Sequence, residues 1–331
     1  SATGDTGFGQ GVAAGDVNED GFPDLLVLNY GDNTLLVNNG DGTFKDDSHK
    51  IRTAKFDWST SAAIADLDGD GLSDLVIVNY CAGLEPVTKT CPMKEGDVFR
   101  SCTPVMFPAA SDVFLQTDSQ GKYVDRTSDW NANPSVLGRG LGIVAGSFDQ
   151  QQGVDVLVAN DMTNNHYWSR SADGDSFGLS ESGVLRGLAG DDRALAQGSM
   201  GIASGDLDAD GDIDFYVTNF QNEYNTYHQQ SSAGIWQDAT SQSQLLAATM
   251  PLVGFGSEAV DLDSDGTLEL LVTNGHVDIF SRGEERSAYA QPMQLFRRNR
   301  AGVYDSIGQA LDGEYLSTPH VGRALWTIDA N

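Results

Sequence analysis

The chain has 331 residues, 40% of them hydrophobic, and a formal net charge of −29 from 48 acidic and 19 basic residues. This excess of acids argues against nucleic acid and anionic membranes as partners, because binding to phosphate groups needs clustered Lys and Arg. No run approaches the roughly 18 apolar residues that a membrane helix needs, so we expect no membrane insertion.

An acidic loop motif recurs along the chain. We use the first residue of each copy of an acidic loop as a marker, and the intervals between markers are 50, 81, 59, 55 and 66 residues. The markers are Asp16, Asp66, Ser147, Asp206, Asp261 and Thr327. Thirteen residues after each of the first five markers stands an asparagine: Asn29, Asn79, Asn160, Asn219 and Asn274. Such self-similarity predicts an array of like structural units.

Each unit predicts four antiparallel strands. A strand of small residues comes first, the acidic loop follows, and then a short apolar run, such as 25–28 or 215–218, predicts a strand buried on both faces. A third strand, for example 34–37, turns through Asn39-Gly40-Asp41-Gly42 into a fourth strand with an aromatic residue. The small-residue strands are expected at 11–15, 61–65, 142–146 and 201–205, and the aromatic residues at Phe44, Tyr123, Phe177, Trp236 and Tyr304.

Four such strands are typical of one blade of a β-propeller. We therefore predict an all-β fold, a β-propeller of four-stranded antiparallel blades that forms a single domain over residues 1–331. The expected repeats span about 1–58, 59–138, 139–197, 198–250, 251–318 and, in part, 319–331. This is five complete blades and the first strand of a sixth. Because Thr327–Asn331 match the start of another loop, we expect the natural protein to continue and its ring to hold six to eight blades.

The second unit has an insertion at about 80–111 that contains all three cysteines, Cys81, Cys91 and Cys102. An odd number permits one disulfide and one thiol, and the sequence does not choose the pair. Zinc is an alternative, but the insertion has neither a CxxC spacing nor a histidine. We expect a disulfide, and hence a secreted, periplasmic or cell-surface location.

Four of the loops carry acidic or amide side chains at alternating positions, which suits a hard cation with oxygen ligands. Positions 1, 3, 5 and 9 would supply side chains and position 7 a backbone carbonyl, while glycine at position 6 allows the sharp turn. We predict about four Ca²⁺ ions. Their ligands would be Asp16, Asn18, Asp20, Phe22 and Asp24; Asp66, Asp68, Asp70, Leu72 and Asp74; Asp206, Asp208, Asp210, Asp212 and Asp214; and Asp261, Asp263, Asp265, Thr267 and Glu269.

The alternatives to calcium loops are EF-hands and loops without an ion. An EF-hand needs a bidentate Glu at position 12 and flanking helices, but position 12 is Val or Ile in all four loops. Loops without an ion would leave three or four carboxylates close enough to repel one another. The third loop keeps acids only at Asp149 and Asp155, and we predict no tightly bound ion there.

The phrase Gly-x-Ala-x-Gly-Asp-x-[Asp/Asn]-x-Asp-Gly-x-x-Asp-Leu-x-Val-x-Asn resembles the FG-GAP/VCBS repeats of integrin α-chain-type propellers. Three further segments, 274–277, 289–297 and 319–325, resemble bacterial ASPIC/UnbV-associated proteins of the cartilage acidic protein type. The resemblance implies an extracellular or periplasmic calcium-binding propeller, often followed by a small C-terminal domain that this sequence does not include. It implies no settled biochemical activity.

The chain shows no nucleophile elbow, phosphate loop or HExxH motif, and its five histidines share no local motif. We therefore expect a non-catalytic binding or adhesion module for a polysaccharide or a protein at the cell surface. The run 164–168 suits a carbohydrate pocket, but its place at a third strand favours ordinary blade residues, and His276 is expected to be a hydrogen-bonded structural histidine. The alternatives are a carbohydrate lyase or dehydratase-type enzyme, which rests on fold analogy, and a structural subunit of a cell-surface assembly.

Overall fold

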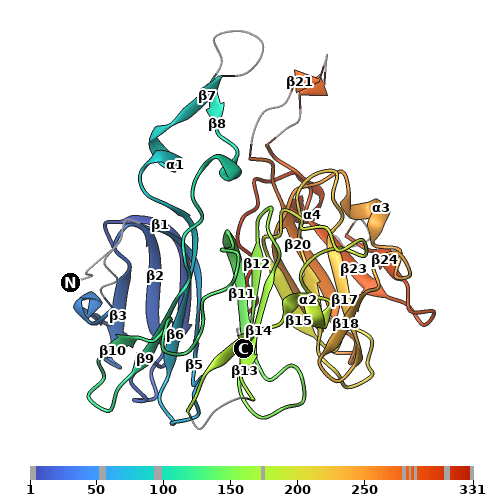
Figure 1. Ribbon diagram of the computed structural model, residues 1–331. Coiled ribbons are helices and arrows are strands. Elements are labelled where there is room, and N and C mark those ends of the chain that lie inside the picture. Colours follow the sequence, from blue (N-terminus) through green and yellow to red (C-terminus); the bar gives the residue numbers. More distant parts are fainter. Residues whose placement is uncertain are drawn as a thin grey trace. The chain divides into compact units, whose positions relative to one another are not determined.

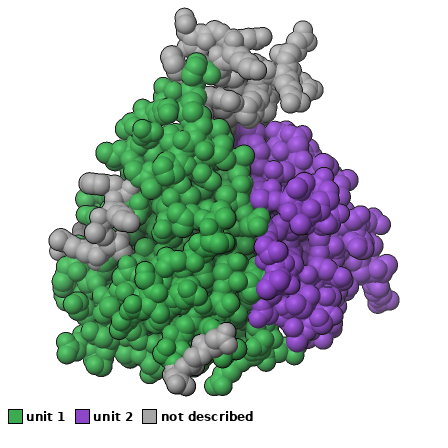
Figure 2. Space-filling view, viewed as in Figure 1, with its two compact units in different colours: residues 1–183 green, residues 184–331 purple. Residues whose placement is uncertain are grey.

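The structure, a computed structural model, describes residues 5–51, 57–92, 99–172, 176–277, 281–282, 285–286, 289–308 and 314–328. Antiparallel strands make up most of the secondary structure in these ranges (Figure 1). The chain divides into two compact units, residues 1–183 and 184–331 (Figure 2). None of the helices in the described ranges combines the length and the apolar character that crossing a membrane would require.

The first unit contains three successive groups of four antiparallel strands. A pairing of Tyr30 with Trp58 joins the first two groups into one eight-stranded sheet. The groups are β1 (Phe8–Gly15), β2 (Asp24–Tyr30), β3 (Thr34–Asn38) and β4 (Phe44–Asp46); β5 (Asp57–Ala65), β6 (Asp74–Ala82), β9 (Val113–Thr117) and β10 (Tyr123–Asp125); and β11 (Gly140–Gly146), β12 (Asp155–Asn160), β13 (His166–Arg170) and β14 (Leu179–Glu181).

The second unit contains two four-stranded antiparallel sheets with the same strand order. They are β15 (Ile202–Gly205), β16 (Asp214–Val217), β17 (Thr226–Ser232) and β18 (Ile235–Asp238), followed by β19 (Gly254–Val260), β20 (Glu269–Asn274), β23 (Gln294–Arg298) and β24 (Tyr304–Ser306). The prediction of an all-β chain of four-stranded antiparallel sheets is thus confirmed.

Short elements lie between these strands. Figure 1 shows β7 and β8 extending away from the four-stranded groups of the first unit. The helices are α1 (Glu85–Thr88), α2 (Gly183–Arg186), α3 (Leu246–Thr249) and α4 (Glu314–Ser317), with 3-10 turns at Ser48–Lys50 and Pro104–Met106; the strand pairs are β7 (Thr90–Pro92) with β8 (Phe99–Ser101), and β21 (Ser281–Arg282) with β22 (Glu285–Arg286).

The second strand of each sheet is buried on both faces. Alternate residues of a strand point to opposite sides, so Leu75 and Ile77 of β6 join a core shared with β2, while Val76 and Val78 join a core shared with β12. In the second unit, β16 and β20 contribute to a third core. Neighbouring sheets within each unit therefore pack face to face, which explains the continuous apolar runs in the sequence.

The repeated asparagine closes the connection between the second and third strands. Its Nδ2 donates to the carbonyl oxygen of the residue two places before the third strand, at 2.7–3.1 Å. In the first four repeats the backbone N–H of the asparagine also donates to a side-chain oxygen, at 2.8–2.9 Å. This oxygen belongs to the residue that directly follows the carbonyl acceptor. These acceptors are Asn33, Asp112, Asn165 and Asn225. The thirteen-residue spacing thus reflects a structural contact.

The structure corrects one sequence expectation and decides a second question that the sequence left open. The predicted position of Phe177 in a fourth strand is wrong: β14 begins at Leu179, which pairs with Arg170 and occupies the place of the aromatic residue. The reason is a hairpin longer than in the first repeat. The cysteine pair, left open by the sequence, is Cys91–Cys102, and Cys81 is a buried free thiol.

Candidate functional site

The acidic loops join the first and second strands of each sheet, and we number acidic loops 1 to 5 in chain order, at 16–24, 66–74, 147–155, 206–214 and 261–269. In loops 1, 2, 4 and 5 the carboxylate at position 1 accepts the backbone N–H groups of positions 5 and 6 at 2.6–3.1 Å. The carboxylate at position 5 accepts the N–H of position 7 at 2.8–3.0 Å. Backbone N–H groups therefore fix the orientation of these carboxylates before any ion binds.

The backbone of these four loops turns through the left-handed region at two positions. Glycine at position 6 has φ between +88° and +96°, which glycine adopts without steric cost. Position 4 also has positive φ, +63° at Ala209 and +59° at Ser264, although neither is a glycine. Residues with a Cβ occupy this region at a cost of about 1–2 kcal/mol, so the loop shape is imposed by the surrounding contacts.

The acids at positions 1, 3 and 5 converge in loops 2, 4 and 5, where one carboxylate oxygen from each lies within 4.8 Å of the other two. In loop 1, position 3 is Asn18, whose Nδ2 donates to Asp20 Oδ2 at 2.9 Å. Burial is the main cause that raises the pKa of Asp68, and the negative charge of the neighbouring Asp70 is the second. A divalent cation would offset such like-charge repulsion, and the all-oxygen set fits calcium.

The acid at position 9 has a different environment. Asp24, Asp74, Asp214 and Glu269 are at most 1% exposed, and each accepts the backbone N–H of position 2 at 2.9–3.2 Å. In loops 1, 2 and 4 the second oxygen accepts a backbone N–H of the third strand at 2.7–3.0 Å. Burial raises the pKa of Asp74 and Asp214 to about 7. Position 9 thus ties the loop to the sheet, and its role as a calcium ligand, like that of the position 7 carbonyl, stays a prediction.

Acidic loop 3 keeps part of this geometry with acids only at positions 3 and 9, and its second positive φ lies at Gly153, position 7, instead of position 6. Asp155 accepts the N–H of Phe148 at 3.0 Å, as in the other loops, and Gln150 at position 4 has φ +62°. Position 1 is Ser147, whose hydroxyl lies 3.5 Å from a backbone oxygen of Gln151. The contact made at position 9 therefore forms without three converging carboxylates.

In loops 2, 4 and 5 the third strand brings one more side chain to the acidic loop, which the sequence analysis missed. Gln116 donates to Asp68 Oδ2 at 2.5 Å, and Gln229 donates to Asp208. In loop 5 the equivalent residue is Arg297, whose guanidinium contacts Asp263 Oδ2 at 2.6 Å and Glu269 Oε1 at 2.7 Å. The sequence did contain a signal for this contact. The third strand of the fifth repeat has a basic residue at the position where the second and fourth repeats have glutamine.

The residues considered for catalysis or carbohydrate binding are mostly buried. His166, Tyr167 and Trp168 are 5%, 0% and 1% exposed, which supports ordinary blade positions. His276 is fully buried, with Nε2 3.1 Å from Gln221 Oε1, as expected for a structural histidine. Burial raises the pKa of Cys81 to about 11, so this thiol is protonated at neutral pH and is a poor nucleophile.

The sequence profile of the FG-GAP-like repeat matches residues 4–77 and 206–272. These ranges contain acidic loops 1, 2, 4 and 5 and omit loop 3. The ASPIC/UnbV resemblance has no such support. None of the curated proteins compared with the chain matches it significantly.

Two solved structures align with most of the chain. One is a lectin of Agrocybe aegerita described as recognising non-reducing terminal N-acetylglucosamine, with 14% identity, 90% of this chain and 79% of that chain covered, and a TM-score of 0.36. The other, from Bifidobacterium bifidum S17, is provisionally assigned as an exo-β-1,3-galactanase, with 10% identity, 91% and 89% covered, and a TM-score of 0.39. Likeness at this level carries no argument about function.

Proposed function

We propose that this chain is a calcium-binding β-propeller that acts outside the cytoplasm as a non-catalytic binding module for a polysaccharide or a protein. The observation that carries the proposal is the coincidence of the FG-GAP-like matches with the four loops predicted to bind calcium. In three of these loops the carboxylates also converge.

The propeller architecture is supported by successive four-stranded sheets that pack face to face within each unit. In this proposal residues 1–331 form one domain with five complete blades, and the loops hold about four Ca²⁺ ions. Positions 1, 3 and 5 supply the converging side chains, with positions 7 and 9 completing the coordination.

A binding role is supported by the cysteine-containing insertion. The Cys91–Cys102 disulfide holds this insertion together and suits an oxidising compartment. Large apolar side chains are exposed around it, among them Leu84 at 54% and Met106 at 49%. Exposed apolar side chains on an insertion are compatible with a surface that contacts a partner.

The test is a panel of neutral and acidic polysaccharides, incubated with the full chain in calcium. Retention on one or more of them without release of reducing or unsaturated products is the expected result. A matched sample in EGTA should lose binding as the loops lose their ions. Release of products from any polysaccharide would overturn the non-catalytic assignment.

A further inference from the structure

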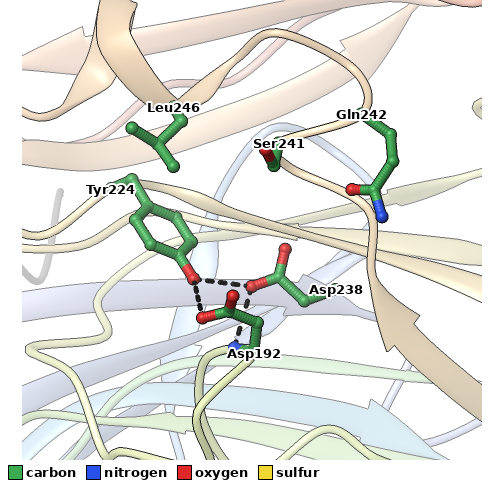
Figure 3. Close-up of a pocket in the computed structure, with 6 residues that line it drawn as sticks. All are labelled: Asp192, Tyr224, Asp238, Ser241, Gln242 and Leu246. Atoms are coloured by element: carbon green, nitrogen blue, oxygen red, sulfur yellow. Dashed lines mark hydrogen bonds between the residues drawn. The ribbon is translucent and has the colours of Figure 1, made fainter.

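A cavity of about 430 Å³ opens in the second unit beside the sheet of β15–β18 (Figure 3). A second hollow of about 380 Å³ shares Asp192, Tyr224 and Leu246 with it. The two volumes are within the range of small-ligand pockets, about 300–1,000 Å³. The cavity is lined by Asp192, Tyr224, Asp238, Ser241, Gln242 and Leu246.

Around Tyr224 the cavity has more hydrogen-bond acceptors than donors. The hydroxyl of Tyr224 lies 2.9 Å from Asp192 Oδ1 and 2.8 Å from Asp238 Oδ2, but it has one proton to donate (Figure 3). The backbone N–H of Asp192 donates to Asp238 Oδ2 at 3.0 Å. Burial is the main cause that raises the pKa of Tyr224, and the two carboxylates raise it further. The hydroxyl therefore keeps its proton. The two carboxylates therefore have acceptor capacity left for a ligand that donates hydrogen bonds.

The surroundings hold this arrangement in place. The carbonyl oxygen of Tyr224 accepts Nδ2 of the repeated Asn219 at 2.7 Å. The loop with Asp192 is folded around buried Asp191, whose carboxylate accepts the backbone N–H groups of Arg193 and Leu195, each at 2.9 Å. Pre-organised polar groups reduce the entropy that binding costs.

The tyrosine of the cavity has no counterpart at the same position in the other four repeats. The position of Tyr224, two residues before the third strand, is held in the other repeats by Asp32, Ser111, Asn164 and Pro292. In each case the scaffold contact uses the backbone carbonyl, so the fold does not need a tyrosine here. A side chain that the scaffold does not require is a candidate for binding.

We propose that this cavity binds a neutral saccharide, whose hydroxyl groups donate to Asp192 and Asp238 while its apolar face contacts Leu246. Ser241 and Gln242 add groups that both donate and accept, as sugar hydroxyls require. An anionic ligand is disfavoured because two carboxylates line the cavity. This inference rests on the proposed function and identifies the site for its polysaccharide alternative.

A metal ion is the main rival occupant. Asp238 Oδ2 already lies within hydrogen-bonding distance of two donors, and Asp192 Oδ1 lies 3.7 Å from the Arg193 guanidinium. Both contacts oppose a cation at these oxygens, whereas calcium takes about six to eight oxygen ligands. A saccharide can share these oxygens because its hydroxyl groups approach the remaining lone pairs.

The experiment titrates the full chain, in calcium, with methyl glycosides of neutral monosaccharides and their oligosaccharides, followed by saturation-transfer NMR and calorimetry. We expect at least one to bind, and Tyr224→Phe and Asp192→Asn to weaken binding by about tenfold or more. Tyr80→Phe is the matched control, because Tyr80 donates to Asp161 at 2.5 Å in the first unit. This control should bind as the wild type does, and melting curves establish that all three variants fold.

The outcomes separate the site from the general function. If the wild type binds a saccharide and both cavity variants bind it equally well, the site is wrong while the binding module stands. If the wild type binds no saccharide but retains a protein partner, the inference falls and the protein alternative of the proposed function remains. If Asp192→Asn removes one bound calcium without affecting saccharide binding, the cavity is a cation site and the inference is overturned.

Discussion

Acidic loops 2 and 5 carry acids at the same four positions, yet the third strand brings a different side chain to each. Loop 2 receives the neutral amide of Gln116, whereas loop 5 receives the guanidinium of Arg297, bonded to positions 3 and 9. An acidic cluster can therefore be compensated either by an ion from solution or by a charge from its own chain. We expect loop 5 to bind calcium more weakly than loop 2, because binding there must displace or oppose an existing positive charge.

The largest expected effect follows from Asp66→Ala in loop 2. This variant removes an ion ligand and leaves the N–H groups of Gly69 and Gly71 without their acceptor. We expect the free energy of unfolding in calcium to fall by about 3 kcal/mol, as measured by urea denaturation. In EGTA the loss should be smaller, since the ion is then already absent.

Asp118→Ala provides the matched control for this prediction. Asp118 also accepts two backbone N–H groups, at 2.9 and 3.0 Å, but lies in a hairpin turn outside the acidic loops. Its replacement should cost the same in calcium and in EGTA. Equal costs of Asp66→Ala in the two conditions would contradict an ion in loop 2.

Exchange of the third-strand residues tests the comparison itself. Arg297→Gln should raise the calcium affinity of loop 5 by about tenfold, because an opposing charge is removed. The same variant should lower stability in EGTA, since the fully buried Glu269 carboxylate loses its ion pair. Gln116→Arg should do the reverse in loop 2. Calorimetric calcium titrations and melting curves measure both effects, and changes of the same sign in the two exchanges would break the comparison.

A smaller effect is expected at a carboxylate that has neither calcium nor arginine assigned to it. Asp112 accepts the N–H of Asn79 at 2.9 Å, where three other repeats use asparagine, and burial raises its pKa to about 7. The folded state therefore holds the proton more tightly than the unfolded state, so this group costs stability as the pH rises from about 4 to about 7. Asp112→Asn should stabilise the protein by about 1–2 kcal/mol at pH 8.

The pH profile checks this prediction. At pH 4 most of the advantage of Asp112→Asn should be lost, because Asp112 is then protonated in the folded state and partly protonated in the unfolded state. Denaturation at pH 4, 6 and 8 gives the profile. An advantage of constant size across this range would show that charge is not its cause.

Much of the fold could be predicted because its signals are local. The acidic positions, the glycine at position 6 and the apolar second strand all fall within about fifteen residues of each marker. The role of Arg297 could not be predicted this way, because it stands 28 residues after Glu269, beyond an insertion whose length hides the strand register. The position of Leu179 was missed for the same reason. The residues that line the cavity at Tyr224 come from, or directly border, three different connections between strands. No single segment of the sequence therefore contains the whole pattern.

The central claim is that calcium in the acidic loops stabilises this scaffold, and one measurement tests it most directly. The melting temperature of the full chain should be recorded in millimolar calcium and after exhaustive chelation, with bound ions counted by native mass spectrometry. We predict about four ions, one of them weaker, and a fall of about 10 °C or more on chelation. An unchanged melting curve in a chain shown to have lost its calcium would contradict the account.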